Sequence, residues 1–288
     1  MMVLDTEFQS NFQSGGNLFD TIMQLQGEVF REMDGRRTLR FQQAGKSYFI
    51  KLHFGVGWKE IWKNLRQFKL PITGAKNEWR AIQRLNQLQV DTMHLVGYGS
   101  RGFNPAKKQS FVITEDLVNT QSLEDFCKSW SASSPLGGDM LQIKRKLIER
   151  IAWIAKTLHE NGVNHRDFYL VHFLLDITPT VPELAQGKIT ASLIDLHRVL
   201  IRRHTPIRWR TKDIGALYFS SMDIGLTKRD IFRFMHDYSG RSLRETLHKD
   251  QKFWLAAQAR AVKLYNKLYH CDPESPQRMG LMRAVKKQ

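Results

Sequence analysis

Four charged side chains occur in an order that suits the transfer of a phosphoryl group. Lys51 ends an alternating run that is typical of a strand, and Glu78 lies in a run with helical periodicity. Asp167 follows in a polar segment, and Asp195 comes directly after an apolar one. In this chemistry a lysine neutralises phosphate oxygens, a glutamate orients the lysine, one aspartate accepts the hydroxyl proton and another holds Mg²⁺. The order therefore predicts phosphoryl transfer from ATP.

The chain also carries a large excess of positive charge. Its 288 residues include 44 Lys and Arg against 28 Asp and Glu, a net charge of +16. Residues 1–116 hold 16 basic and 11 acidic residues, and residues 117–288 hold 28 and 17. Such a charge favours nucleic acid, an anionic membrane surface, an acidic protein or a phosphorylated glycan as partner. A hydrophobic content of 42% is sufficient for a packed core and excludes a wholly disordered basic protein.

Cysteine usage and the distribution of apolar residues exclude further classes. Only Cys127 and Cys271 occur, far apart, which excludes a disulfide scaffold and a cysteine-based zinc site. No run of 18 apolar residues is present, and the N-terminus, with Asp5 and Glu7, lacks the apolar segment of a signal peptide. We therefore expect a soluble cytosolic protein.

The elements that must position these side chains fall into two groups. The first third of the chain reads as a three-strand antiparallel meander, two helices and two further strands. The expected ranges are strands at 28–32, 37–42 and 46–53, a helix at 58–69, a helix from residue 75, and strands at 94–98 and 110–114. Their sum predicts a β-rich N-terminal lobe over residues 1–116.

The pattern becomes mostly helical after residue 116. We expect helices at 123–130 and 142–161, with Gly162 as the stop of the second, and a strand at 188–194. The remainder is predicted to be helical to about residue 270, which gives a larger lobe at 117–272 and a basic, flexible tail at 273–288. The fold class predicted is α+β with two lobes.

The motifs resemble those of the protein-kinase-like superfamily, and within it the bacterial lipopolysaccharide core heptose(I) kinases. The matching segments are QGEVFRE (26–32), RRTLRF (36–41), AGKSYFIK (44–51), ITEDL (113–117), NHRD (164–167), HFLL (172–175), IDLHR (194–198) and YFSSMDIGLTKRDI (218–231). The resemblance covers nearly the whole chain. It implies a protein-kinase-like fold and ATP- and Mg²⁺-dependent phosphorylation of the first heptose of the inner core, at the cytoplasmic face of the inner membrane.

The resemblance also implies roles for individual residues. Asp167 would be the catalytic base, with Arg166 and His165 beside it. Lys51, paired with Glu78, would contact the ATP phosphates. The connector at Glu115 and Leu117 would hold the adenine through its backbone.

Three departures from the usual protein-kinase pattern bear on these roles. No GxGxxG loop is present, and the turn between the first two strands contains Arg36 and Arg37, which could hold phosphates instead. His172 occupies the place of a second metal-binding asparagine, beside the metal-binding Asp195, although Mg²⁺ prefers oxygen ligands. No long activation segment follows Asp195, which suits a small-molecule-type kinase.

The densest basic segment follows Asp195 directly. It contains Arg198, Arg202, Arg203, Arg208, Trp209, Arg210 and Lys212 and no acidic residue. Arginine recognises carboxylates and phosphates, so this segment is expected to bind an anionic inner-core acceptor. A solvated basic loop is the alternative. Asp213 resembles the helix aspartate that supports the catalytic loop in the superfamily.

Several alternatives stay open from the sequence. The apolar face of residues 58–69, with Trp58 and Trp62, suits either an anionic bilayer or the core of the lobe. The chain could instead phosphorylate protein tyrosine, serine or threonine, or act as a non-catalytic scaffold for an anionic partner. An acidic protein partner also suits its charge. No known nucleic-acid-binding motif occurs, which argues against nucleic acid.

Overall fold

The computed structural model describes residues 1–12, 17–33, 35–55, 57–66, 74–130 and 136–273. They form two compact units. The first comprises Met1–Gln87, Thr92–Val118 and Leu196–Arg198. The second comprises Leu88–Asp91, Asn119–Asp195 and the chain from Val199 onward. The tail expected at 273–288 lies, apart from its first residue, outside the described residues.

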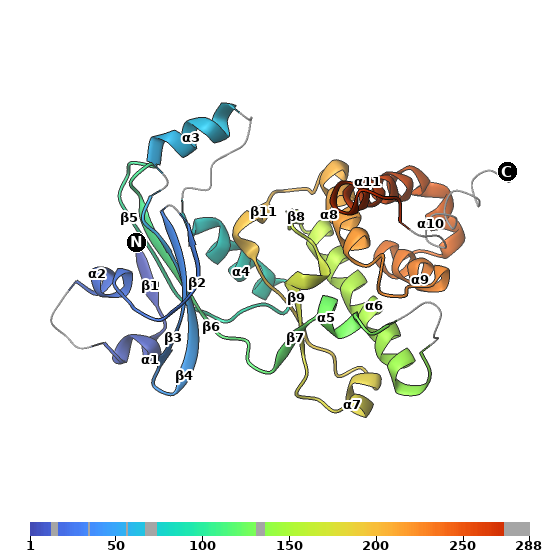
Figure 1. Cartoon of the computed structure of the whole chain (residues 1–288), viewed down its shortest axis with the longest axis horizontal. Coiled ribbons are helices and arrows are strands. Elements are labelled where there is room, and N and C mark those ends of the chain that lie inside the picture. Colours follow the sequence, from blue (N-terminus) through green and yellow to red (C-terminus); the bar gives the residue numbers. More distant parts are fainter. Residues whose placement is uncertain (13–16, 34, 56, 67–73, 131–135, 274–288) are drawn as a thin grey trace. The chain divides into compact units, whose positions relative to one another are not determined.

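The first unit is built on a six-stranded antiparallel sheet (Figure 1). In order across the sheet, the strands are β1 (Met2–Leu4), β5 (Leu95–Arg101), β6 (Gln109–Glu115), β4 (Lys46–His53), β3 (Arg36–Gln43) and β2 (Glu28–Met33). The expected meander is confirmed as β2–β3–β4. The sequence pattern missed β1, because three residues are too few to show a period and their partners, such as Gly99 opposite Met2, lie far along the chain.

Alternating side chains of the central strands build the core of this unit. Tyr48, Ile50 and Leu52 of β4 are buried, and the residues between them point to the other face. Two short helices, α1 (Thr6–Ser10) and α2 (Leu18–Met23), add Phe8 and Phe19 among others to the same core. Helices α3 (Gly57–Arg66) and α4 (Lys76–Gln87) follow near their expected positions.

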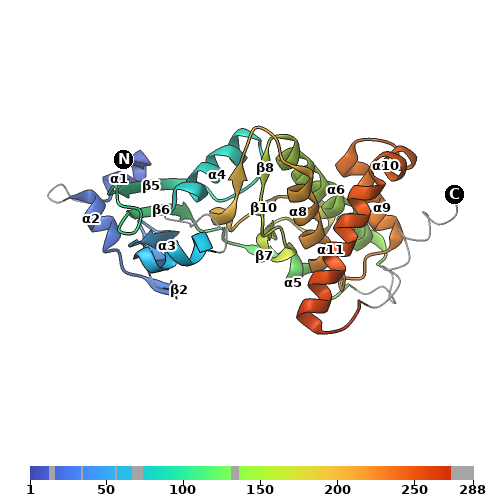
Figure 2. The same ribbon diagram turned by 90° about the horizontal axis from the view of Figure 1, so that it is seen from above.

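The second unit is mostly helical. Its α-helices are α5 (Leu123–Cys127), α6 (Gly138–Glu160), α7 (Val181–Ala185), α8 (Ile207–Ser220), α9 (Lys228–Ser239), α10 (Leu243–Lys249) and α11 (Gln251–Tyr269). Helix α8 packs along α11 (Figure 2), and Gly215 permits this close approach, since a Cβ there would lie 3.0 Å from the carbonyl oxygen of Ala257. The strand-rich first unit and helical second unit confirm the predicted α+β class.

Short strands flank the loops of the second unit and form two small sheets. β7 (Thr120–Ser122), β9 (Phe173–Asp176) and β10 (Ala191–Leu193) form one small sheet, and β8 (Val163–Asn164) pairs with β11 (Leu200–Ile201). Gly162 ends α6 with a φ of 77°, as predicted, and a Cβ at this position would lie within bonding distance of the Arg202 carbonyl oxygen. The strand predicted at 188–194 is shorter, because the backbone amides of Lys188 and Ile189 bond locally to Glu183 and Gly187.

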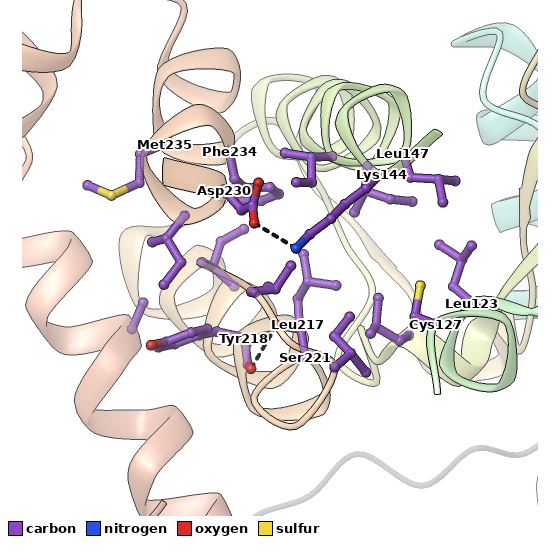
Figure 3. Close-up of a pocket in the computed structure, with 18 of the residues that line it drawn as sticks. Leu123, Cys127, Lys144, Leu147, Leu217, Tyr218, Ser221, Asp230, Phe234 and Met235 are labelled. Atoms are coloured by element: carbon purple, nitrogen blue, oxygen red, sulfur yellow. Dashed lines mark hydrogen bonds and ion pairs between the residues drawn. The ribbon is translucent and has the colours of Figure 1, made fainter. Parts of the chain in front are cut away.

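A buried ion pair joins α6 to α9 (Figure 3). The Nζ atom of Lys144 lies 2.8 Å from Oδ2 of Asp230, with each side chain 6% exposed, and Nζ also donates to the carbonyl oxygen of Gly225 at 2.9 Å. Burial alone raises the pKa of Asp230, but hydrogen bonds from Lys144 and Thr227 outweigh burial and hold this pKa below its usual value of 3.8. The pair is therefore ionised at neutral pH.

Within the part of the chain that the structure describes, no helix has both the length and the apolar content needed to cross a bilayer.

The buried pair predicts a specific loss of stability in a Lys144→Met variant. Removing the lysine leaves the buried Asp230 with the longer contact to Arg233, 3.5 Å from Nη1 to Oδ1, as its remaining ion pair among the described residues, so we expect the free energy of unfolding to fall by about 3 kcal/mol in urea titrations at neutral pH. Lys146→Met removes an exposed lysine paired with Glu149 on the same helix and should cost at most about 1 kcal/mol.

The pH dependence provides a second readout of the same pair. Because the folded-state pKa of Asp230 is lowered, its contribution to stability is present above pH 3.8 and is lost as the pH falls through the folded-state value. The stability difference between the native chain and Lys144→Met should therefore shrink on acidification. A difference that is small at pH 7, or unchanged by acid, would contradict this assignment.

Candidate active site

A buried carboxylate on α8 holds the loop that contains Asp167. The side chain of Asp213 is 1% exposed, and its Oδ2 accepts the backbone N–H of His165 at 2.7 Å while Oδ1 accepts that of Arg166 at 2.9 Å. Arg166 has a φ of 77°, a left-handed conformation that costs energy in a side-chain-bearing residue. Asp213 thus fixes a strained backbone directly before Asp167. This is the supporting place that the resemblance implied.

His165 lies in the interior rather than among reacting groups. The residue is 1% exposed, and its Nε2–H donates to the carbonyl oxygen of Ile194 at 3.0 Å. Burial lowers the pKa of His165, so the imidazole is neutral. The prediction that placed His165 among the catalytic groups therefore needs correction. It cannot touch a substrate, and it ties the Asp167 loop to the strand end before Asp195.

His172 and Asp195 face one another beside Asp167. Nδ1 of His172 donates to the carbonyl oxygen of Asp167 at 2.7 Å, so Nε2 is the ring nitrogen that remains for another ligand. This Nε2 lies 3.6 Å from Oδ2 of Asp195, a residue with a φ of 57°. A carboxylate oxygen and an imidazole nitrogen are both known metal ligands, so the pair fits a cation.

The expected Mg²⁺ could use His172 and Asp195 as its protein ligands, with the remaining ligands supplied by phosphate. The described residues contain no group of three or more His, Cys, Asp or Glu side chains that could hold a metal alone. Mg²⁺ in phosphoryl-transfer sites is commonly bound by one or two protein groups together with phosphate oxygens. A ligating histidine usually donates its other N–H to a carbonyl, as His172 does to Asp167.

In the sheet unit, Lys51 and Glu78 form the predicted ion pair. Nζ of Lys51 lies 2.6 Å from Oε1 of Glu78, whose side chain is 2% exposed. Lys51 occupies an interior strand, opposite Thr38 and Val112. Such a buried carboxylate on a helix can hold a lysine ammonium rigidly. The pair is thus placed as the resemblance implied.

The two arginines of the first turn differ in their surroundings. Arg37 is held by Glu32 of the neighbouring strand, with Nη2 2.5 Å from Oε1. Arg36 lies opposite His53, and burial together with the charges of Arg36 and Lys51 lowers the pKa of His53 to about 3. His53 is therefore neutral beside a positive region. Arg37 already bonds a carboxylate, which reduces the charge that it can offer to a phosphate.

The connector is fastened to the sheet by a network that the sequence analysis missed. Oδ2 of Asp116 accepts from the Ser47 hydroxyl at 2.9 Å and lies 2.7 Å from Nη2 of Arg40. The backbone N–H of Asp116 donates to Ser47, and that of Glu115 donates to His94. Leu117 follows directly. No local pattern could reveal this network, because Ser47 and Asp116 lie 69 residues apart.

The arginines of the basic segment are divided between the two units. Arg198 belongs to the first unit, whereas Arg202, Arg203, Arg208 and Arg210 belong to the second. Arg210 donates to the carbonyl oxygens of Thr205 and His159, which gives it a structural place rather than the expected acceptor contact. Arg202 bonds Oδ1 of the buried Asn164, while Arg203 and Arg208 are exposed.

Sequence reasoning also missed His159, an interior partner of Asp213, and Tyr238, which bonds His159. Nδ1 of His159 lies 2.8 Å from the Tyr238 hydroxyl, and Nε2 of the same ring lies 3.4 Å from Oδ2 of Asp213. Both residues are buried. The sequence offered one signal for this contact, since His159 is a polar residue next to Leu158 on the mostly apolar stripe of α6. These contacts support Asp213 from the side away from the loop.

A separate cavity lies among the helices of the second unit (Figure 3). It contains about 860 Å³ of space outside protein atoms, part of it open to solvent. Leu147, Leu217, Phe234 and Met235 are among its mostly apolar lining residues, with the Lys144–Asp230 pair at its wall. Cys127 also lines it, and burial raises the pKa of this thiol to about 12, so it is protonated and unreactive as expected.

Comparison with known proteins places these features in a family. The chain is similar to lipopolysaccharide core heptose(I) kinase WaaP of Escherichia coli, at 48% identity over 87% of this chain and 92% of the relative. The corresponding protein of Pseudomonas aeruginosa is 44% identical over 92% of this chain and 96% of the relative. A solved structure described as WaaP in complex with acyl carrier protein is 40% identical, with a TM-score of 0.76 over 92% of this chain and 99% of that one.

These similarities confirm both the predicted fold and the resemblance that the motifs carried. The family model for lipopolysaccharide kinases matches residues 20–238, more than half of the chain. The chain belongs to the lipopolysaccharide kinase (Kdo/WaaP) family.

Proposed function

We propose that the chain transfers the γ-phosphoryl group of ATP to a hydroxyl of the first heptose of the lipopolysaccharide core. The observation that carries this proposal is the loop of Asp167, fixed by Asp213 and adjoining His172 and Asp195, in a chain 44–48% identical to curated heptose(I) kinases. Such a reaction contributes to lipopolysaccharide biosynthesis, on which the outer membrane depends.

The residues of the second unit act on the acceptor and the metal. Asp167 orients the attacking hydroxyl and accepts its proton, and its own position is set by the backbone bonds to Asp213. Asp195 and Nε2 of His172 hold Mg²⁺, which neutralises charge on the phosphate oxygens when bound. His165 holds the loop, and Arg166 precedes the base.

The residues of the first unit act on ATP. Lys51, oriented by Glu78, neutralises phosphate oxygens. Arg36 adds positive charge near the same strands, and the connector at Glu115 and Leu117, fastened through Asp116, bonds the adenine through its backbone. The protein supplies positioning and charge rather than a covalent intermediate.

Two alternative functions, a non-catalytic scaffold and a protein kinase, have less support. A scaffold without turnover has no need of the Lys51–Glu78 pair in the first unit, nor of the His172–Asp195 pair with the adjoining Asp167 in the second. A protein kinase would share these groups, but the relatives carry the name of sugar kinases. Phosphate found on a purified protein substrate, with none on core glycolipid, would favour the protein kinase.

We also propose that the chain works in the cytoplasm at the inner-membrane surface. The exposure of side chains on α3 supports this proposal, because Ile61 is 5% exposed whereas Trp58 and Trp62 are 52% and 60% exposed. Two exposed indoles one turn apart suit the interfacial region of a bilayer. The net charge of +16 suits an anionic surface and an acidic protein partner.

An acyl carrier protein is the acidic partner that we propose. The solved relative forms a complex with acyl carrier protein, and this chain has the apolar cavity that an acyl chain would need. Occupation by an acyl chain would stabilise the helices α6, α8 and α9 around the cavity.

Replacement of the proposed base should abolish transfer without unfolding the chain. Asp167→Asn keeps the size of the side chain but removes its capacity to accept a proton, so we expect kcat for core glycolipid to fall by about 10²–10⁴-fold. The KM for ATP and the melting temperature should be unchanged. Asp139→Asn, an exposed aspartate at the start of α6, is the matched control. Full activity of purified Asp167→Asn would contradict the assignment of Asp167 as the catalytic base.

The lysine pair can be tested with two lysines of one strand. Lys51→Met should lower kcat/KM for ATP by about 10²–10³-fold, since it removes a charge aimed at the phosphates. Glu78→Gln should shift the same parameter in the same direction, less strongly. Lys46→Met removes an exposed lysine of β4 paired with Glu7 and should change nothing. Equal losses in both lysine variants would show that Lys51 has no special part.

A substitution that fills the cavity should weaken the binding of the acylated carrier protein and leave the binding of the unacylated carrier unchanged. Leu217→Trp inserts a large ring into the cavity, at a stability cost of about 1–3 kcal/mol. The melting temperature of native chain should rise on adding long-chain acyl carrier protein, and that of Leu217→Trp should rise no more than with the unacylated carrier. Leu268→Trp, at an exposed site on α11, is the control. An equal rise in all three proteins would rule out the cavity as the acyl site.

A further inference from the structure

Four cationic side chains surround a single indole ring in the second unit. We name this group the Trp209 cluster, and it consists of Trp209, Arg166, Arg202, Arg208 and Lys212. The distances from the ring centroid to the charged groups are 4.2 Å for Lys212, 5.0 Å for Arg208, and 5.5 Å for Arg166 and Arg202. All are within the range of a cation–π contact.

One aromatic ring cannot account for this concentration of charge. An indole has two faces, so it attracts two cations well, and the remaining pairs of cations repel one another. Within the described residues, the side chain of Arg202 bonds the neutral amide oxygen of Asn164. Within the described residues, neither Arg208 nor Lys212 forms an ion pair with a carboxylate.

The carboxylate that follows Lys212 in the chain is bonded to the backbone elsewhere. Both oxygens of Asp213, the residue after Lys212, accept backbone N–H groups of the Asp167 loop. Partial burial lowers the pKa of Lys212, and the charges of Arg208, Arg260 and Arg166 lower it further. An anion in the cluster would remove this repulsion.

The cluster is also tied to the proposed catalytic loop. Arg166 directly precedes Asp167, and its backbone is fixed by Asp213. Lys212 and Trp209 lie on α8, the helix that carries Asp213. An anion held by these side chains would therefore keep a defined position relative to Asp167, within one unit of the protein.

We propose that the Trp209 cluster binds an oxyanion, a carboxylate or a phosphate, that the acceptor carries beside the sugar to be phosphorylated. This inference rests on the proposed function. It adds Arg166 and Lys212 to the acceptor site and removes Arg198 and Arg210 from it. A reaction that attaches the anionic group must then precede phosphorylation by this chain.

Charge-neutral variants test the cluster through the acceptor. Arg208→Gln with Lys212→Gln should raise the KM for glycolipid acceptor by about 10-fold to 100-fold, the loss expected for one or two charge-assisted hydrogen bonds. The KM for ATP should stay constant. Arg229→Gln with Lys252→Gln removes an exposed arginine and an exposed lysine of the same unit and is the matched control. Arg208→Lys keeps the charge. As a single substitution it should therefore retain most of the acceptor affinity that the single substitution Arg208→Gln loses.

The two sources of the oxyanion can be separated with modified acceptors. If a carboxylate is recognised, reduction of acceptor carboxyl groups to alcohols should raise the KM of the native chain to that of the double variant. If a phosphate is recognised, phosphatase treatment of the acceptor should do so. An acceptor KM that none of the substitutions or modifications changes would overturn the inference.

Inorganic phosphate tests the site without any turnover. Phosphate should change the tryptophan fluorescence of the native chain in a saturable way, and both Trp209→Phe and the Arg208→Gln/Lys212→Gln variant should lose this change. A saturable change that persists in the double variant would overturn the inference even in an active enzyme. If the native chain fails to phosphorylate glycolipid but shows the change, the proposed function fails and the anion site stands.

Discussion

The carboxylate of Asp213 is the constraint on which the site of the second unit depends. It accepts the two backbone N–H groups that precede Asp167, and one of them belongs to Arg166 in a left-handed conformation. A strained backbone persists only where surrounding bonds hold it. His159, braced by Tyr238, approaches the same carboxylate from the helix α6. The loop is thus fixed by interior contacts before any substrate binds.

Much of this arrangement follows from the sequence, and the limits have physical causes. The strands 28–53, the helix ending at Gly162 and the Lys51–Glu78 pair were predictable, because period, turn residues and motif order are local signals. The interior place of His165, the Arg40–Ser47–Asp116 network and the engagement of Arg210 were not. Each depends on contacts between distant segments, which neither charge nor periodicity reveals.

The structure also changes how the basic segment is understood. In the sequence, residues 198–212 form one run of positive charge. In the fold, Arg198 lies in the sheet unit, Arg210 bonds backbone carbonyls, and Arg202 and Arg208 gather with Lys212 around Trp209. A concentration of unneutralised cations beside the loop of Asp167 is a more specific feature than net charge. It suits a kinase whose acceptor is an anionic glycolipid.

The central claim is that this chain places a phosphate on the first heptose of the lipopolysaccharide core. Mass spectrometry of core oligosaccharide tests it most directly, in cells that lack the gene and in the same cells with the gene restored. We expect the core oligosaccharide to lack one heptose-bound phosphate in cells without the gene and to regain it when the gene is restored. Identical phosphate content in both, with the protein shown to be present in the restored cells, would contradict the account.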